Sequence, residues 1–120
     1  MYLFVYGTLK RGFGNHAVLR GAEYVGRADL WGYEMYSLGG FPGIVPCTGF
    51  SCVQGEVYEV SDFLSLDRLE GYNPDTDNGM YLRREVEIGW KDDEGEAPAY
   101  AYIWNREVIG RRLIASGEWK

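Results

Sequence analysis

Residues 97–104 read Ala-Pro-Ala-Tyr-Ala-Tyr-Ile-Trp, and this stretch indicates the fold of the chain most clearly. Successive side chains of a β-strand point to opposite faces, so Ala99, Ala101 and Ile103 would share one face and three aromatic residues the other. Because neither face is polar, both need a cover. A strand with two apolar faces suits a small β-barrel that carries helices on its outside.

Further strands are predicted on both sides of this stretch. Residues 81–90 are a second long strand candidate, joined to it by the acidic, glycine-containing turn Asp92-Asp93-Glu94-Gly95, so the two predict a hairpin. Shorter candidates are residues 3–6, closed by Gly7, residues 55–60, and residues 23–35 with interruptions at Gly26 and Gly32. Glycine accounts for 17 of the 120 residues, which favours β structure with many corners.

One helix is predicted with clear boundaries, from Asp62 to Glu70. Ser61 is a good N-cap residue, and Gly71 stands where a left-handed C-cap residue belongs. Residues 16–20 predict a turn or two of helix, residues 39–43 a bend, and residues 105–120 a short helix or an arm. The fold class expected from these elements is α+β, a small β-barrel with flanking short helices.

Length and charge restrict the function classes. A chain of 120 residues that is 46% hydrophobic fits one domain over residues 1–120. The net charge of −6 is the wrong sign for binding a phosphate backbone, so no nucleic acid partner is expected. No apolar run is long enough to span a bilayer, and residues 1–6 lack the basic start of a signal peptide. We therefore expect a cytoplasmic protein without a membrane partner.

Few residues are available for nucleophilic or metal chemistry. Cys47 and Cys52 have no second cysteine pair or histidine nearby, so they give no zinc set and are predicted to be reduced thiols, with a disulfide or redox role as the alternative. His16 is the only histidine, and a mechanism that needs several histidines is excluded. A loop or packing role is expected for it ahead of a direct chemical one.

Two motifs resemble binding sites, one for a dinucleotide and one for calcium, but the residues around them do not fit either site. Residues 12–17 fit a loose dinucleotide fingerprint, but the glycines lie several residues beyond the strand end and no repeated strand-helix units follow. The segment starting at Asp75 looks like a calcium loop, yet Met80 and Val86 stand where glycine and glutamate are required. The sequence therefore predicts no cofactor and no metal.

Glu70 breaks a local rule. It is the last residue of the predicted helix, where the negative end of the dipole disfavours a carboxylate. At about 100° per residue it shares a helix face with Phe63 and Leu66, which should be buried, and with Asp67. Burial and the like charge of Asp67 should raise its pKa, which suits a group that moves protons near neutral pH.

A structural interpretation of Glu70 is equally open. The carboxylate could instead form an ion pair with Arg68, Arg83 or Arg84. Helical spacing alone does not decide between these two interpretations.

Several segments, taken in order, resemble a known family. They are residues 4–12 (Phe-Val-Tyr-Gly-Thr-Leu-Lys-Arg-Gly), 15–16 (Asn-His), 41–43 (Phe-Pro-Gly), 55–58 (Gly-Glu-Val-Tyr), 66–72 (Leu-Asp-Arg-Leu-Glu-Gly-Tyr), 81–83 (Tyr-Leu-Arg) and 101–102 (Ala-Tyr). This series is similar to the γ-glutamylcyclotransferase-like family, which includes the avirulence-induced plant proteins and the γ-glutamylamine cyclotransferases. The match covers nearly the whole chain to about residue 104.

The resemblance implies a small mixed barrel with peripheral helices and an enzymatic cavity. It assigns Tyr6, Gly7, Thr8 and Leu9 to the substrate-binding loop, Glu70 to general acid/base catalysis, and Tyr81, as a weaker assignment, to the cavity wall. In the family reaction, the free α-amine of a γ-glutamyl compound attacks its own γ-carbonyl and releases an amine and 5-oxoproline. Because the nucleophile belongs to the substrate, no enzymatic Ser, Cys or His nucleophile is required.

The identity of the leaving amine stays open at this level. The stretch 73–79 resembles an insertion that would shape the cavity rim, and a γ-glutamylamine or a related small conjugate is the expected substrate. A barrel of the same fold that binds a small ligand without turnover is the alternative. A third interpretation is an interaction module that presents its aromatic side chains to a partner.

Overall fold

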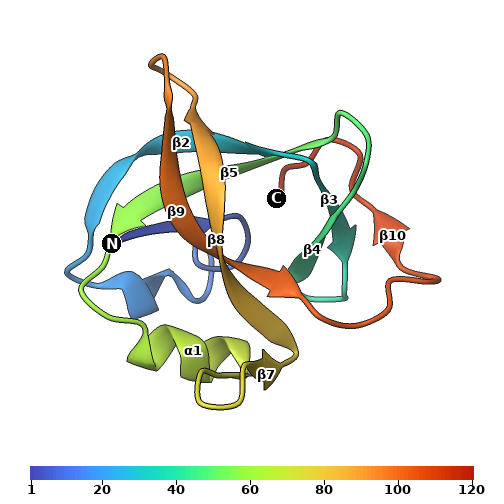
Figure 1. The fold of residues 1–120 in the computed structure, drawn as a ribbon, viewed down its shortest axis with the longest axis horizontal. Coiled ribbons are helices and arrows are strands. Elements are labelled where there is room, and N and C mark those ends of the chain that lie inside the picture. Colours follow the sequence, from blue (N-terminus) through green and yellow to red (C-terminus); the bar gives the residue numbers. More distant parts are fainter.

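The computed structural model describes residues 1–120, which form a β-rich fold with little helix (Figure 1). In chain order the elements are β1 (Tyr2–Val5), the 3-10 helix η1 (His16–Leu19), β2 (Glu23–Trp31), β3 (Tyr33–Ser37), β4 (Pro42–Pro46), β5 (Cys52–Glu59), α1 (Leu64–Glu70), β6 (Tyr72–Asn73), β7 (Asn78–Gly79), β8 (Tyr81–Trp90), β9 (Glu96–Trp104) and β10 (Arg112–Leu113). No helix has the length and apolar character needed to cross a bilayer.

Five strands close into a barrel in the order β1-β5-β2-β8-β9. All neighbouring strands run antiparallel except β1 and β9, which pair in parallel where Leu3 meets Tyr100. The barrel is therefore mixed, and helix and sheet together give the α+β class expected from the sequence. The predicted hairpin is present, with β8 at the predicted bounds and β9 one residue longer at its start.

The two faces of β9 pack into two apolar clusters, as its alternation predicted. Ala99, Ala101 and Ile103 lie in the cluster that fills the barrel. On the other face, Tyr102 is buried in the outer cluster, against which Tyr100 and Trp104 pack in part. Leu66 of α1 and Val60 belong to this outer cluster, so the outer aromatic side chains support the helix region rather than face solvent.

A second sheet, in the order β10-β3-β4, extends the barrel at one side. The chain enters it at Gly32, whose positive φ of 85° ends β2 and lets the next strand turn away. The predicted bend at residues 39–43 is only partly correct, because Pro42 and Gly43 already pair with β3 as the start of β4. The segment after β9 is an arm that adds β10 to this sheet, not a helix.

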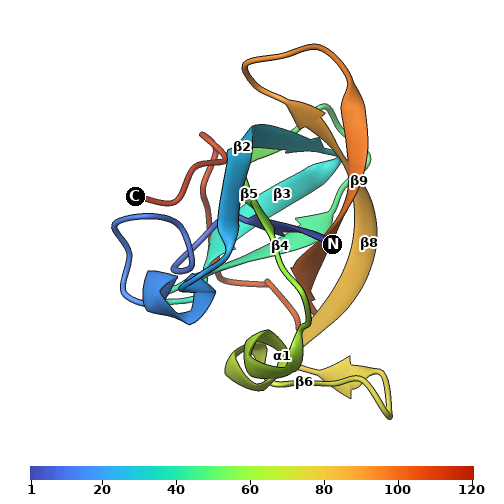
Figure 2. The same cartoon turned by 90° about the vertical axis from the view of Figure 1, so that its left-hand side faces the viewer.

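Helix α1 begins later than predicted. It starts at Leu64, and the residue in the N-cap position is Phe63, not Ser61. Phe63 is 8% exposed and packs edge-on against Tyr100, so burial of its ring sets where the chain enters the helix. The predicted C-cap is correct, since Gly71 is left-handed with φ 69° and ψ 36°. Figure 2 shows α1 against one end of the barrel, with β6 beside it.

Candidate functional site

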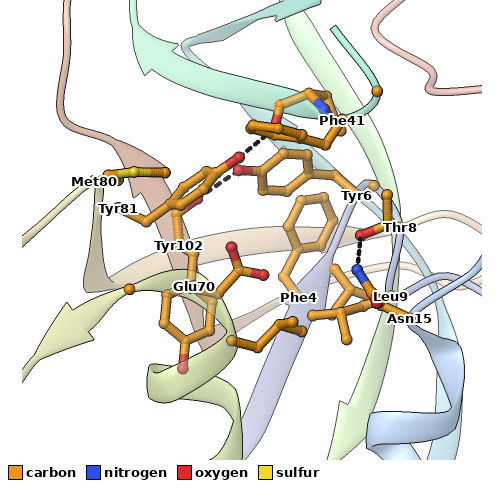
Figure 3. A pocket seen from close by; sticks show the side chains of 16 residues that line it. Phe4, Tyr6, Thr8, Leu9, Asn15, Phe41, Glu70, Met80, Tyr81 and Tyr102 are labelled. Atoms are coloured by element: carbon orange, nitrogen blue, oxygen red, sulfur yellow. Dashed lines mark hydrogen bonds between the residues drawn. The ribbon is translucent and has the colours of Figure 1, made fainter. Parts of the chain in front are cut away.

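A cavity of about 330 Å³ opens where the loop after β1 faces the end of α1 (Figure 3). Its wall comes from five parts of the chain: β1 with the following loop, the bend leading into β4, the end of α1, the start of β8 with the residue before it, and Tyr102 of β9. Its lining residues are Phe4, Val5, Tyr6, Gly7, Thr8, Leu9, Asn15, Gly40, Phe41, Pro42, Leu69, Glu70, Gly71, Met80, Tyr81 and Tyr102. All six residues that the sequence analysis assigned to the site lie in this lining.

The loop after β1 is held by its own polar contacts. The amide of Lys10 donates to the carbonyl of Gly7 over 3.0 Å, and Asn15 donates to the Thr8 carbonyl from its backbone N and to Thr8 Oγ1 from Nδ2. The carbonyl of Leu9 lies 2.9 Å from Nδ1 of His16. The carbonyls of this loop are therefore used within the chain.

The amide N–H groups of the same loop are not used in this way. No backbone or side-chain acceptor within the chain receives the N–H of Gly7, Thr8 or Leu9. Three successive donors beside a cavity can bind an oxyanion or a carboxylate. His16 takes part only by holding the Leu9 carbonyl, and it does not line the cavity.

Gly7 is needed for the close approach of this loop to β4. A Cβ at this position would lie 2.7 Å from Cγ of Pro42, so the loop and the strand would have to move apart. We expect Gly7→Ala to lower the free energy of unfolding by about 1–3 kcal/mol, the usual cost of overpacking, and to distort the cavity. Gly14→Ala is the matched control, because nothing lies within 4 Å of a Cβ there.

Urea denaturation measures both variants. Equal stability of Gly7→Ala and Gly14→Ala would contradict the close packing against Pro42.

Glu70 occupies the end of α1 with its carboxyl group directed into the cavity (Figure 3). It is half-buried, and burial raises the pKa of its carboxyl from 4.5 to about 7. Neither oxygen accepts a hydrogen bond from the protein, and none of the six ion pairs in the chain includes it. An unpaired carboxyl group that titrates near neutral pH can both take and give a proton.

The ion-pair interpretation of Glu70 is therefore wrong for this structure. Arg83 pairs with Asp67, and Arg84 pairs with Asp77. The expected effect of Asp67 on the pKa of Glu70 is also absent, since burial alone raises that pKa. Asp67 does not line the cavity, and its carboxylate contacts Arg83 of β8 and Tyr102 of β9.

That contact anchors the helix. Asp67 is 5% exposed, and Nη1 of Arg83 donates to its two carboxylate oxygens over 2.9 and 2.7 Å. The hydroxyl of Tyr102 donates to Oδ1 of the same carboxylate over 2.7 Å. The guanidinium of Arg83 also lies over the Phe63 ring, 4.3 Å from its centroid.

Two tyrosines of the cavity wall are fixed as hydrogen-bond donors. The hydroxyl of Tyr6 donates to the Tyr102 carbonyl, and that of Tyr81 donates to the Pro42 carbonyl, both over 2.6 Å. Burial, and secondarily nearby acidic groups including Glu70, raises the pKa of both phenols. Both hydroxyls therefore stay protonated while Glu70 titrates.

Sequence reasoning did not find several lining residues. Asn15, Phe41 and Leu69 were parts of the motifs that carry the resemblance but had no assigned role, and Met80 had no distinguishing pattern. No three His, Cys, Asp or Glu side chains gather in a way that could hold a metal ion. The two cysteines are free and lie outside this cavity.

The fold and the cavity define a class of protein, a small closed barrel with one unpaired carboxyl group in a side cavity. The sequence model of the family described as gamma-glutamyl cyclotransferase, AIG2-like, matches residues 3–120 of this chain. The gamma-glutamylcyclotransferase family protein YtfP of Escherichia coli K12 is 35% identical over 119 residues, which cover 99% of this chain and 96% of YtfP. The chain belongs to this γ-glutamyl cyclotransferase, AIG2-like family.

Two further relatives extend the comparison. The solution structure of the Escherichia coli ytfP protein superimposes with a TM-score of 0.72 at 34% identity, covering 99% of this chain and 96% of that one. The gamma-L-glutamyl-butirosin B gamma-glutamyl cyclotransferase of Niallia circulans is 32% identical over 109 residues, which cover 88% of this chain and 67% of the relative.

Proposed function

We propose that this chain is a γ-glutamyl cyclotransferase of the γ-glutamylamine type, which releases 5-oxoproline and a free amine, with Glu70 as general acid/base. The observation that carries the proposal is the unpaired, half-buried Glu70 carboxyl group in a cavity that is also lined by residues 7–9, whose N–H groups have no acceptor within the chain. The name of the Niallia circulans relative, which specifies a γ-L-glutamyl conjugate, supports the reaction type.

The reaction forms one bond and breaks another. The α-nitrogen of the substrate bonds to its γ-carbonyl carbon, and the bond from that carbon to the leaving nitrogen breaks. The α-ammonium gives up two protons as it becomes a lactam N–H, and the amine leaves with two more protons, as an ammonium ion. Glu70 takes one proton from the α-nitrogen and returns it to the leaving nitrogen, while the ring nitrogen loses its second proton to water and the released amine takes its second proton from water. Ring closure is intramolecular, so holding the substrate folded supplies much of the rate.

Residues 6–9 and Tyr81 supply the binding side of the proposal. The N–H groups of Gly7, Thr8 and Leu9 are the donors available to the substrate carboxylate or to the oxyanion that forms at the γ-carbonyl. Tyr6 and Tyr81 form a rigid wall, because each hydroxyl is already bonded to a backbone carbonyl. No metal or cofactor is required by these steps.

A turnover assay tests the proposal. Wild-type protein is incubated with γ-glutamyl amines and γ-glutamyl amino acids, and 5-oxoproline is measured by chromatography. Release of 5-oxoproline together with one equivalent of amine supports the proposal. Binding of these compounds in calorimetry without any turnover would instead support the ligand-binding barrel.

The pH profile gives an independent prediction. Because the ionised carboxyl group accepts the first proton and burial raises the pKa of Glu70 to about 7, kcat/KM should rise about tenfold per pH unit below pH 7 and level off above it. Steady-state assays from pH 5 to 8 measure this. A rising limb near pH 4.5 would contradict the assignment to Glu70.

A further inference from the structure

The mouth of the cavity differs from its interior in how far its apolar side chains are exposed. The inner wall is buried: Phe4 is 1%, Leu9 5% and Tyr81 5% exposed. Phe41, Leu69 and Met80, which also line the cavity, are 38%, 40% and 44% exposed. Exposure thus separates a buried inner part from an outer rim of three large apolar side chains.

Each rim residue comes from a different part of the fold. Phe41 ends the bend before β4, where its carbonyl accepts the N–H of Leu38 over 2.9 Å. Leu69 precedes Glu70 on α1, and Met80 links the β6–β7 hairpin to β8. Three apolar side chains brought together at one opening leave apolar surface in water unless a ligand covers it.

The charges of the cavity also limit what can lie at its mouth. Glu70 is the only charged side chain in the lining, and no lysine, arginine or histidine lines the cavity. In a γ-glutamyl amino acid, a carboxylate carbon stands two bonds from the nitrogen that Glu70 must protonate. That carboxylate would meet a like charge with no cationic side chain in the lining to offset it.

Arg106 is the cationic side chain that could offset a carboxylate at the mouth, because it contacts the residue before Met80. Its Nη1 donates to the carbonyls of Gly79 and Asn105 over 3.0 and 2.9 Å. It is not among the residues that line the cavity. The arginine therefore supports the segment that carries Met80.

We infer that the preferred leaving amine carries an apolar alkyl or aryl group and no carboxylate, and that Phe41, Leu69 and Met80 determine this preference. The inference rests on the proposed function, since it places the γ-glutamyl part beside Glu70 and the leaving group at the mouth. The rim then covers the apolar group as the substrate binds.

Three matched substrates test it: γ-glutamyl phenethylamide, γ-glutamyl methylamide and γ-glutamylphenylalanine. The first and third differ only by a carboxylate, and the first two only in apolar size. For wild-type protein we expect kcat/KM of the phenethylamide to exceed that of each of the other two by roughly tenfold or more, the scale of small apolar differences in a pocket. Equal or better turnover of γ-glutamylphenylalanine would overturn the inference.

Rim variants assign the preference to its residues. Phe41→Ala and Met80→Ala should each bring the phenethylamide to methylamide ratio several-fold closer to one. Phe50→Ala, which removes a ring that is 97% exposed and outside the cavity, should keep the wild-type ratio. A ratio unchanged in both rim variants would overturn the assignment. So would a fall in γ-glutamylphenylalanine turnover in Arg106→Gln with phenethylamide turnover unchanged, because it would show that a cation serves the carboxylate at the mouth.

Binding measurements separate this inference from the proposed function. If none of the three compounds yields 5-oxoproline, the proposed reaction fails, and calorimetry on wild type and Glu70→Gln then compares the dissociation constants. A phenethylamide that binds about tenfold more tightly than the methylamide would still support the apolar rim. Equal dissociation constants would overturn it.

Discussion

Glu70→Gln should lower the rate of 5-oxoproline release by about 10²–10⁴-fold, the range for loss of a general acid/base group. Gln keeps the size and polarity of the side chain but neither accepts nor returns a proton at neutral pH. Substrate binding should change much less, since the proposed anion donors are the backbone N–H groups of residues 7–9. The measurement is single-turnover release with saturating substrate, which separates the chemical step from binding.

The same substitution should make the protein more stable above neutral pH. The folded-state pKa of Glu70 is about 7 and its ordinary value is 4.5, so between these values the folded state holds more protons than the unfolded state. Wild-type stability therefore falls as the pH rises through this window, and the loss is complete above pH 7. Gln does not ionise, so the variant does not lose stability in this way.

The size of this gain has a ceiling. At about 1.4 kcal/mol per pKa unit, the shift corresponds to at most about 3 kcal/mol, and partial exposure of the carboxyl group reduces this to roughly 1–3 kcal/mol. Urea denaturation at pH 8 and pH 4.5 should show the gain only at the higher pH. Glu85→Gln, on the exposed side of β8, is the control. A variant that loses both activity and stability at pH 8 would contradict the burial of an unpaired carboxyl group.

Local patterns predicted the parts of the fold that depend on neighbours in sequence. The alternation in β9 correctly divided its side chains between two buried faces, and Gly71 marked the end of α1. Closure of the barrel depends on the parallel pairing of Leu3 with Tyr100, and no local pattern reports a contact so distant in the sequence. The start of α1 was placed wrongly for a related reason, since burial of Phe63 against β9 outweighed the capping preference of Ser61.

The sequence likewise predicted some features of the candidate site and not others. Helical spacing placed Glu70 on a buried face and predicted a raised pKa, which the structure confirms with burial as the cause. Spacing also put Asp67 nearby on that face but could not say which group it faces. Its partners are Arg83 and Tyr102, which lie 16 and 35 residues further along the chain. Exposed residues of bends and linkers, such as Phe41, follow no repeating hydrophobic pattern. The sequence therefore could not predict that they lie at the cavity mouth, and only the folded structure shows it.

Asp67→Ala should lower the free energy of unfolding by about 3–5 kcal/mol, the usual effect of removing one partner of a buried ion pair. The change leaves the Arg83 guanidinium, whose side chain is 21% exposed, without its carboxylate. It also removes the acceptor of the buried Tyr102 hydroxyl. Asp92→Ala is the matched control, because its pair with Arg27 is exposed at both side chains and is worth at most about 1 kcal/mol.

A double-mutant cycle shows whether the pair itself carries the effect. Arg83→Met keeps much of the apolar stem that packs near Phe63 while removing the charge that Asp67→Ala leaves unpaired. The double variant should therefore be more stable than the sum of the two single losses predicts, by roughly 1–3 kcal/mol. Additive losses would mean that packing, and not the ion pair, holds α1 against β8. Because α1 carries Glu70, the single variant should also lose 5-oxoproline release at temperatures where it is still folded, and the double variant should regain part of it.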